Sequence, residues 1–146
     1  MLGVMILSDL SLTKHVVTVY SKCFFWLRQL KRARRSLDAE SIKTLVNAFV
    51  TSRVDYGNII LVGAPKSVID KLQCVLNTAA RTVTGTGKYD RGLSHLLHTE
   101  LHRLDVPERV LYKLALIVHR YLQHKAPQYL LNCCVPVSEV ASRQQL

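Results

Sequence analysis

Apolar residues recur at helical spacing along most of this chain. Between about residues 13 and 37, one apolar stripe combines spacings of three and four residues, and its members are Val16, Tyr20, Cys23, Leu27 and Leu30. Such spacing places the side chains on one face of an α-helix. The pattern predicts a first helix over 13–37, with Thr13 as its N-cap.

A second apolar stripe follows Asp38. This residue is placed to cap a helix, and Glu40 puts negative charge in the first turn. The pattern predicts one long helix over 39–61, with a weak point at Gly57. Its apolar face is expected to contain Ile42, Leu45, Phe49, Ser52, Tyr56 and Ile59.

A third helix is predicted over 67–84, with Gly85 as its C-cap. Its apolar face contains Val68, Leu72, Val75, Ala79 and Val83. We expect the second and third helices to pack antiparallel through Phe49, Tyr56, Leu72, Val75 and Ala79.

The two ends of the chain carry weaker signals. A short helix is predicted over 93–101 and a longer one from Pro107, while Pro127 and Pro136 are expected to end regular structure. Residues 2–7 form an apolar run that predicts a β-strand without partners, and such a strand can mediate self-association. The predicted fold is all-α: a three-helix bundle, a C-terminal helical pair and an orphaned N-terminal strand.

Composition and charge restrict the class of partner. A chain of 146 residues suffices for one compact domain, and 20 Lys and Arg against 10 Asp and Glu leave a formal charge of +10. This balance favours a polyanion, with nucleic acid first and an anionic membrane surface second. No apolar run approaches the ~18 residues of a membrane span and no basic segment of a secretion signal is present. We therefore expect an intracellular protein, in the nucleus or cytoplasm, with reduced cysteines.

The cations concentrate in the first predicted helix. The span 14–35 contains seven Lys and Arg residues and no acid. Positions 28, 32 and 35 fall on one helix face that can follow the phosphates of a nucleic-acid backbone. The candidate binding residues are Lys22, Arg28, Lys31, Arg32, Arg34 and Arg35. A solvated helix face or a nuclear-localisation patch would show the same pattern.

Other polar residues point to structure rather than catalysis. Asp55 and Arg81 are expected to form an ion pair between the second and third helices, although an intrahelical or solvent-exposed arrangement is the alternative. Two-metal nucleotidyl transfer requires adjacent carboxylates, and no two acidic residues are adjacent in this sequence. Three histidines at 95, 98 and 102 lack a fourth ligand at a recognisable spacing. We therefore expect no enzymatic activity, no metal and no cofactor.

Several strings in this sequence form a recognisable series. The central ones are Ser52-Arg53-Val54-Asp55-Tyr56-Gly57-Asn58, Gly63-Ala64-Pro65 and Leu72-Gln73-Cys74-Val75-Leu76-Asn77-Thr78-Ala79-Ala80-Arg81. Before them stand Leu2-Gly3-Val4, Asp9, Leu10, Leu12 and His15, and after them Leu101-His102-Arg103-Leu104-Asp105-Val106, Arg109, Tyr112, Lys113, Ala126-Pro127, Tyr129 and Leu130. The series resembles the region after the polymerase core in reverse transcriptases of non-LTR retrotransposons, of the jockey-like and chicken-repeat-like lineages. It departs from the family pattern at Gly57, Leu76, Arg103 and Asp105.

The resemblance implies a division of the chain and a function. Residues 1–12 would be a remnant palm strand, 13–85 a thumb-like three-helix bundle, 86–136 a post-thumb helical segment and 137–146 a loose tail. The chain would be a fragment of an RNA-directed DNA polymerase without its catalytic palm. At most it would bind template-primer duplex non-specifically through the basic helix face. The alternative is a non-enzymatic helical interaction protein derived from the same scaffold.

Overall fold

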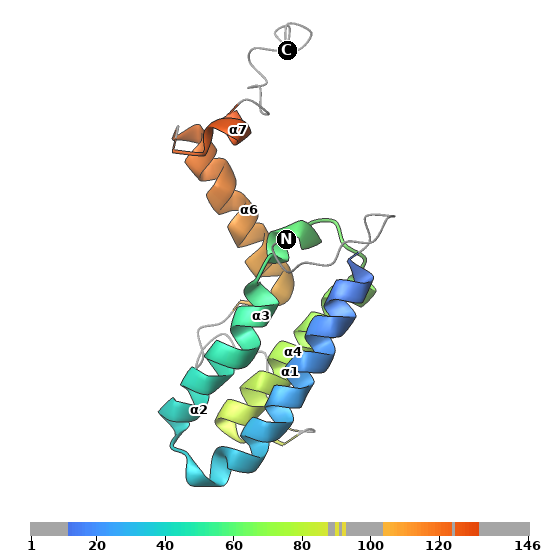
Figure 1. The fold of residues 1–146 in the computed structure, drawn as a ribbon, viewed down its shortest axis with the longest axis vertical. Coiled ribbons are helices and arrows are strands. Elements are labelled where there is room, and N and C mark those ends of the chain that lie inside the picture. The colour runs from blue at the N-terminus through green and yellow to red at the C-terminus, as the bar shows by residue number, and fades with distance from the viewer. Residues whose placement is uncertain (1–11, 88–89, 91, 93–103, 124, 132–146) are drawn as a thin grey trace, which may run out of the picture. The chain divides into compact units, whose positions relative to one another are not determined.

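A computed structural model describes residues 12–87, 90, 92, 104–123 and 125–131 of the chain (Figure 1). All regular structure within these ranges is helical, which confirms the all-α class for this part of the chain. The predicted N-terminal strand, the helix over 93–101 and the tail over 137–146 lie outside the described residues. The chain divides into two compact units, 1–111 and 112–146.

The first unit contains three packed helical segments. Helix α1 spans Thr13–Ala33, a second segment consists of α2 (Ala39–Val46), a π-turn (Asn47–Thr51) and α3 (Ser52–Asp55), and α4 spans Lys66–Thr84. Figure 1 shows α1 and α4 running in the same direction and the α2–α3 segment returning antiparallel to them. The core between them contains Val16, Cys23, Leu27, Ile42, Val46, Val50, Val54, Leu72, Val75 and Ala79.

The helix ends follow local rules with one exception. The side chain of Asp38 accepts a hydrogen bond of 3.1 Å from the backbone N–H of Ser41, which confirms the predicted cap. This bond holds the pKa of Asp38 below its ordinary value. Gly85 ends α4 in the left-handed region with a φ of 81°, also as predicted. Thr13 is not an N-cap, because it is already the first helical residue after Leu12.

The predicted face of the second segment is confirmed for Ile42, and Leu45 and Phe49 pack against the core, but the C-terminal part of the predicted face is wrong. The structure buries residues at a constant spacing of four: Ile42, Val46, Val50 and Val54. In a regular α-helix, residues four apart drift by about 40° per step, so these four would spread over about 120°. The π-turn absorbs much of this drift, because Ser52 donates its N–H to Asn47, five residues earlier, and one extra residue enters the turn.

This shift changes the partners of two residues that were expected to contact α4. Tyr56 has an extended backbone after α3 and is 52% exposed, because Gly57 adopts a left-handed φ of 65° and ends the helix. Phe49 instead stacks on Trp26 of α1, with ring centroids 4.5 Å apart. The expected α4 members of the contact, Leu72, Val75 and Ala79, are buried in the core.

Helix α6 (Val106–Leu122) begins in the first unit with one of the two bonds of a capping box. The N–H of Asp105 donates to the carboxylate of Glu108 at 2.9 Å, and the carbonyl of Asp105 accepts the first helical bond, from Arg109. The side chains of Val106 and Val110 are buried in the core of the first unit.

The second unit contains the rest of α6 and a short helix α7 (Gln128–Leu131). The N–H of Leu130 bonds to the carbonyl of Pro127, so Pro127 precedes a helical turn and the expected end of regular structure there is wrong. None of the helices in the described part of the chain is long and apolar enough to cross a membrane.

Replacement of Ala79 by Leu should destabilise the bundle. The Ala79 side chain is fully buried where α4 meets the core, so the larger side chain must displace its neighbours and should cost about 1–3 kcal/mol. Urea unfolding monitored by circular dichroism measures the loss. Ala33→Leu, at an exposed position of α1, is the matched control and should change stability by less than about 0.5 kcal/mol. Equal effects of the two variants would contradict the placement of Ala79.

Candidate nucleic-acid interface

Four of the predicted cations form an exposed surface on α1 and its terminal 3-10 turn. These residues, Arg28, Lys31, Arg32 and Arg35, are here called the basic face. At 3.6 residues per turn they span about 100° of the helix circumference. Arg28 donates its Nε–H to the carbonyl of Phe24 at 3.3 Å. Among the described residues, no carboxylate lies within ion-pair distance of any of the four.

Arg34 belongs to the bundle rather than to this surface. It is half-buried, and its guanidinium lies over Gly85 at the end of α4, where even a Cβ atom would overlap it. Gly85 is therefore required for its φ and for its lack of a side chain. Arg34 joins the ends of α1 and α4, so its prediction as a phosphate ligand is not supported by its position.

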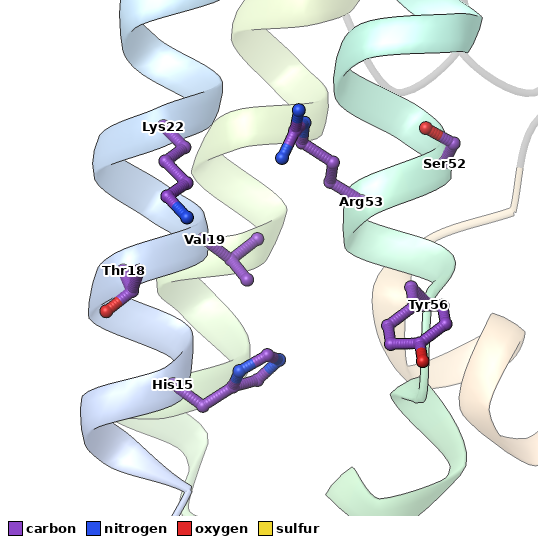
Figure 2. Close-up of a pocket in the computed structure, with 7 residues that line it drawn as sticks. All are labelled: His15, Thr18, Val19, Lys22, Ser52, Arg53 and Tyr56. Carbon is purple, nitrogen blue, oxygen red and sulfur yellow. The ribbon is translucent and has the colours of Figure 1, made fainter. Parts of the chain in front are cut away.

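Lys22 lies on another side of α1. It precedes Arg28 by six residues, which places it about 120° away around the helix. There it lines a cleft of about 450 Å³ between α1 and α3 (Figure 2). The other lining residues are His15, Thr18, Val19, Ser52, Arg53 and Tyr56. Among the described residues, the lining thus contains two cations, a histidine and three hydroxyl groups, and no carboxylate.

The sequence prediction missed the part of this cleft contributed by α3. The predicted apolar face of a continuous helix contains Ser52 and Tyr56, and the predicted binding residues do not include Arg53. Because the π-turn brings Val50 and Val54 to the core, these three residues are exposed instead. The sequence signal that could identify Arg53 as a ligand is its position in the Ser-Arg-Val-Asp-Tyr string, because a charged side chain does not contribute to an apolar helix face.

His15 is the titratable group at one end of the cleft. Burial lowers the pKa of its imidazole, and the positive charge of Lys22 lowers it further. The neutral ring is therefore favoured near neutral pH, and it presents one donor and one acceptor nitrogen.

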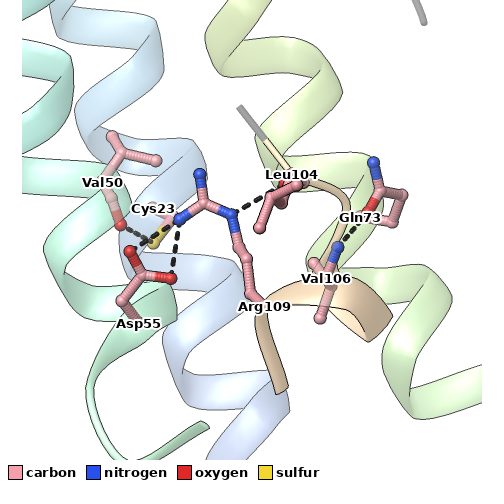
Figure 3. A network of polar contacts seen from close by, with 7 residues as sticks. All are labelled: Cys23, Val50, Asp55, Gln73, Leu104, Val106 and Arg109. Carbon is pink, nitrogen blue, oxygen red and sulfur yellow. Dashed lines mark hydrogen bonds and ion pairs between the residues drawn. The ribbon is translucent and has the colours of Figure 1, made fainter. Parts of the chain in front are cut away.

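The predicted ion pair between Asp55 and Arg81 is wrong. Both carboxylate oxygens of Asp55 accept hydrogen bonds from Nη1 of Arg109, at 2.8 and 2.7 Å (Figure 3). The α3 and α4 helices run antiparallel, so Asp55 lies near the start of α4 and Arg81 near its other end. The Nε atom of Arg81 is buried without a hydrogen-bond partner.

A second set of polar contacts holds the start of α6 against α4. Gln73 donates from Nε2 to Asp105 at 2.7 Å and to Asn77 at 3.0 Å, and its Oε1 accepts the N–H of Val106 at 2.8 Å. Arg109 also donates its Nε–H to the carbonyl of Leu104 at 2.8 Å (Figure 3). These bonds satisfy backbone groups at the N-terminus of α6 and orient Arg109 toward Asp55.

Metal-ligating and thiol side chains are the other candidate chemistry in this part of the chain. No group of three or more His, Cys, Asp or Glu residues that could hold a metal ion occurs among the described residues. The predicted weak candidates at 95, 98 and 102 lie outside them. Cys23 is buried, donates to the carbonyl of Val50 at 3.9 Å, and has its pKa raised to about 11 by burial. Comparison with protein-family models, curated proteins and solved structures finds no match to this chain.

The ion pair between Asp55 and Arg109 should contribute measurably to stability. A double-mutant cycle with Asp55→Ala and Arg109→Met should give a coupling energy of about 1–3 kcal/mol, because the hydrogen bonds are short, charged and partly shielded from water. The exposed pair Glu40–Lys43, at 3.9 Å, is the control and should couple by about 0.5 kcal/mol or less. Comparable coupling in both cycles would show that the Asp55 pair has no structural role.

His15 should make stability depend on pH. The folded-state pKa lies below the ordinary value, so the unfolded chain binds the proton more readily. The contribution of His15 to the free energy of unfolding is fully present above about pH 6.5, and it is lost as the pH falls through the lowered folded-state pKa. Urea unfolding of wild type and His15→Gln at about pH 7.5 and about pH 5 measures it. Wild type should lose more stability on acidification than the variant, and parallel losses would refute the prediction.

Proposed function

We propose that this chain binds nucleic acid without sequence specificity, through phosphate contacts of the basic face. The observation that carries the proposal is the set of four exposed cations on α1, none of which has a carboxylate partner among the described residues. Cations that are not neutralised within the protein remain available to phosphates and release condensed counterions when they bind. A template-primer duplex of RNA and DNA is the partner implied by the resemblance.

We further propose that the chain is a remnant of a non-LTR retrotransposon reverse transcriptase, comprising its thumb and post-thumb helices. Support comes from residues that match the family strings and that contact one another here. Asp55 pairs with Arg109, and Gln73 bonds to Asn77 and to the start of α6. Such contacts join strings that are distant in sequence within one fold. No two acidic residues are adjacent in these 146 residues, so we propose no role in nucleotidyl transfer for these helices by themselves.

A helical interaction protein is the second candidate function. The observation that favours it is a set of exposed apolar side chains in the second unit: Leu116, Ile117, Val118, Leu122 and Tyr129. Association through such residues holds or strengthens as salt rises, whereas phosphate binding weakens. The expected self-association through the N-terminal strand concerns residues outside the described part of the chain.

Neutralising the basic face should weaken duplex binding and reduce its dependence on salt. The triple variant Arg28→Gln, Arg32→Gln and Arg35→Gln removes up to three phosphate contacts. Each lost contact should lower the slope of log K against log salt by about 0.9 for duplex DNA, so the total change should approach but not reach about 2.7. Fluorescence anisotropy with two unrelated duplexes at several salt concentrations measures this slope.

The matched control removes the same charge elsewhere. Lys66→Gln, Arg120→Gln and Lys125→Gln change three exposed cations outside the basic face. This control should retain most of the wild-type slope. Equal loss in the two triple variants would assign binding to net charge alone, and the absence of wild-type binding at about 100 mM salt would favour the interaction protein.

A further inference from the structure

The cleft between α1 and α3 differs from the basic face in a way that indicates a ligand of its own. Cations approach it from two separate elements, Lys22 from α1 and Arg53 from α3 (Figure 2). Both are exposed and neither has an ion-pair partner among the described residues. A concave site lined by charges of one sign concentrates the field and attracts an anion.

The nearest carboxylate does not neutralise the cleft. Asp55 lies two residues after Arg53, yet both of its oxygens accept bonds from Arg109. The hydroxyl groups of the lining are also committed, because Thr18 donates to the carbonyl of Lys14 at 2.9 Å and Ser52 to that of Ala48 at 2.6 Å. Lys22 and Arg53 are therefore the principal donors that the cleft offers to an anionic ligand.

A buried amide in a small cavity that adjoins the cleft is an independent indication of a ligand. Asn58 is 1% exposed, and among the described residues neither its Oδ1 nor its Nδ2 atom has a hydrogen-bond partner. It lines a small cavity of about 10 Å³ that shares His15, Arg53 and Tyr56 with the cleft. An unpaired buried amide is costly, so a polar atom is required there. The cavity volume suits one water or one ligand atom.

Tyr56 gives the cleft an aromatic wall. Its ring is 52% exposed, because Gly57 ends the helix immediately after it and the ring is not drawn into the core. Exposed aromatic rings beside cations are typical of sites that stack a nucleobase while holding its phosphate. The volume of about 450 Å³ lies within the range of small-molecule sites.

We propose that this cleft is a nucleotide-binding site, in which Lys22 and Arg53 hold a phosphate and the ring of Tyr56 stacks against the attached base. Asn58 binds a water or a ligand atom in the small cavity that adjoins the cleft. The phosphate is either the terminal monoester or an internal diester of a strand. The site is separate from the basic face and does not depend on duplex binding by that face.

The test uses the full chain and three probes: inorganic phosphate, a short oligothymidine with a 5′-phosphate and the same strand without it. Lys22→Gln and Arg53→Gln should each weaken binding of the strands about tenfold, as expected for loss of a charged hydrogen bond. Lys66→Gln removes the same charge from an exposed position outside both the cleft and the basic face, and it should change affinity less than about twofold. A stronger affinity for the phosphorylated strand identifies the monoester, and equal affinities identify the diester.

The aromatic wall has its own pair of variants. Tyr56→Leu should weaken strand binding about tenfold while Tyr56→Phe retains it, because only the former removes the stacking ring. Neither change should affect weak binding of inorganic phosphate. Thermal unfolding checks that each variant is folded. A loss that is equal for the Lys22, Arg53 and Lys66 variants would overturn the proposal, as would no affinity of the wild type for either strand.

A measurement on the wild-type protein avoids dependence on the variants. Titration of the unphosphorylated or phosphorylated strand should shift the NMR resonances of the His15 imidazole, the Tyr56 ring and the Asn58 amide together. Resonances of the basic face should respond with a different midpoint. Shifts confined to the basic face would overturn the proposal even if the strands bind.

Discussion

The π-turn over Asn47–Thr51 decides which residues of the second helical segment face the core. It holds Val46, Val50 and Val54 on one side although they are four residues apart, and it carries the carbonyl to which the Cys23 thiol donates. In a regular helix these three residues would spread over about 80° of the circumference. The extra residue thus gives the bundle a continuous core, and it leaves Arg53 and Tyr56 outside, where they form one wall of the cleft.

A second constraint acts on the polar residues around α6. Arg109 occupies the carboxylate of Asp55, and Gln73 satisfies the first backbone groups of the helix. Both contacts have a structural explanation, because they hold Val106 and Val110 in the core. The pair of Asp55 with Arg109 also affects the charge of the cleft, since a carboxylate bound to Arg109 is not available to Arg53. The same ion pair therefore supports the fold and leaves the neighbouring cleft without a neutralising anion.

The sequence predicted what depends on local chemistry. Asp38 and Gly85 terminate helices through short-range hydrogen bonds and backbone preferences, so their roles could be recognised from a few neighbouring residues. The face of the second segment could not, because spacings of three and four at Leu45, Phe49, Ser52 and Tyr56 suit a regular helix equally well. The partner of Asp55 lies 54 residues away, and only tertiary packing distinguishes Arg109 from Arg81. The inward position of Arg34 likewise depends on the end of another helix.

The two cationic surfaces of α1 place different demands on a nucleic acid. Lys22 and Arg28 are about 9 Å apart along the helix axis and about 120° apart around it. A duplex is stiff over about 50 nm, so one that lies on the basic face cannot also turn into the cleft without severe bending. A single strand is flexible enough to pass from one surface to the other, and its unstacked bases can reach an aromatic wall. If the basic face and the cleft both bind nucleic acid, a single strand is therefore flexible enough to occupy the two surfaces at once. A duplex would occupy the basic face alone.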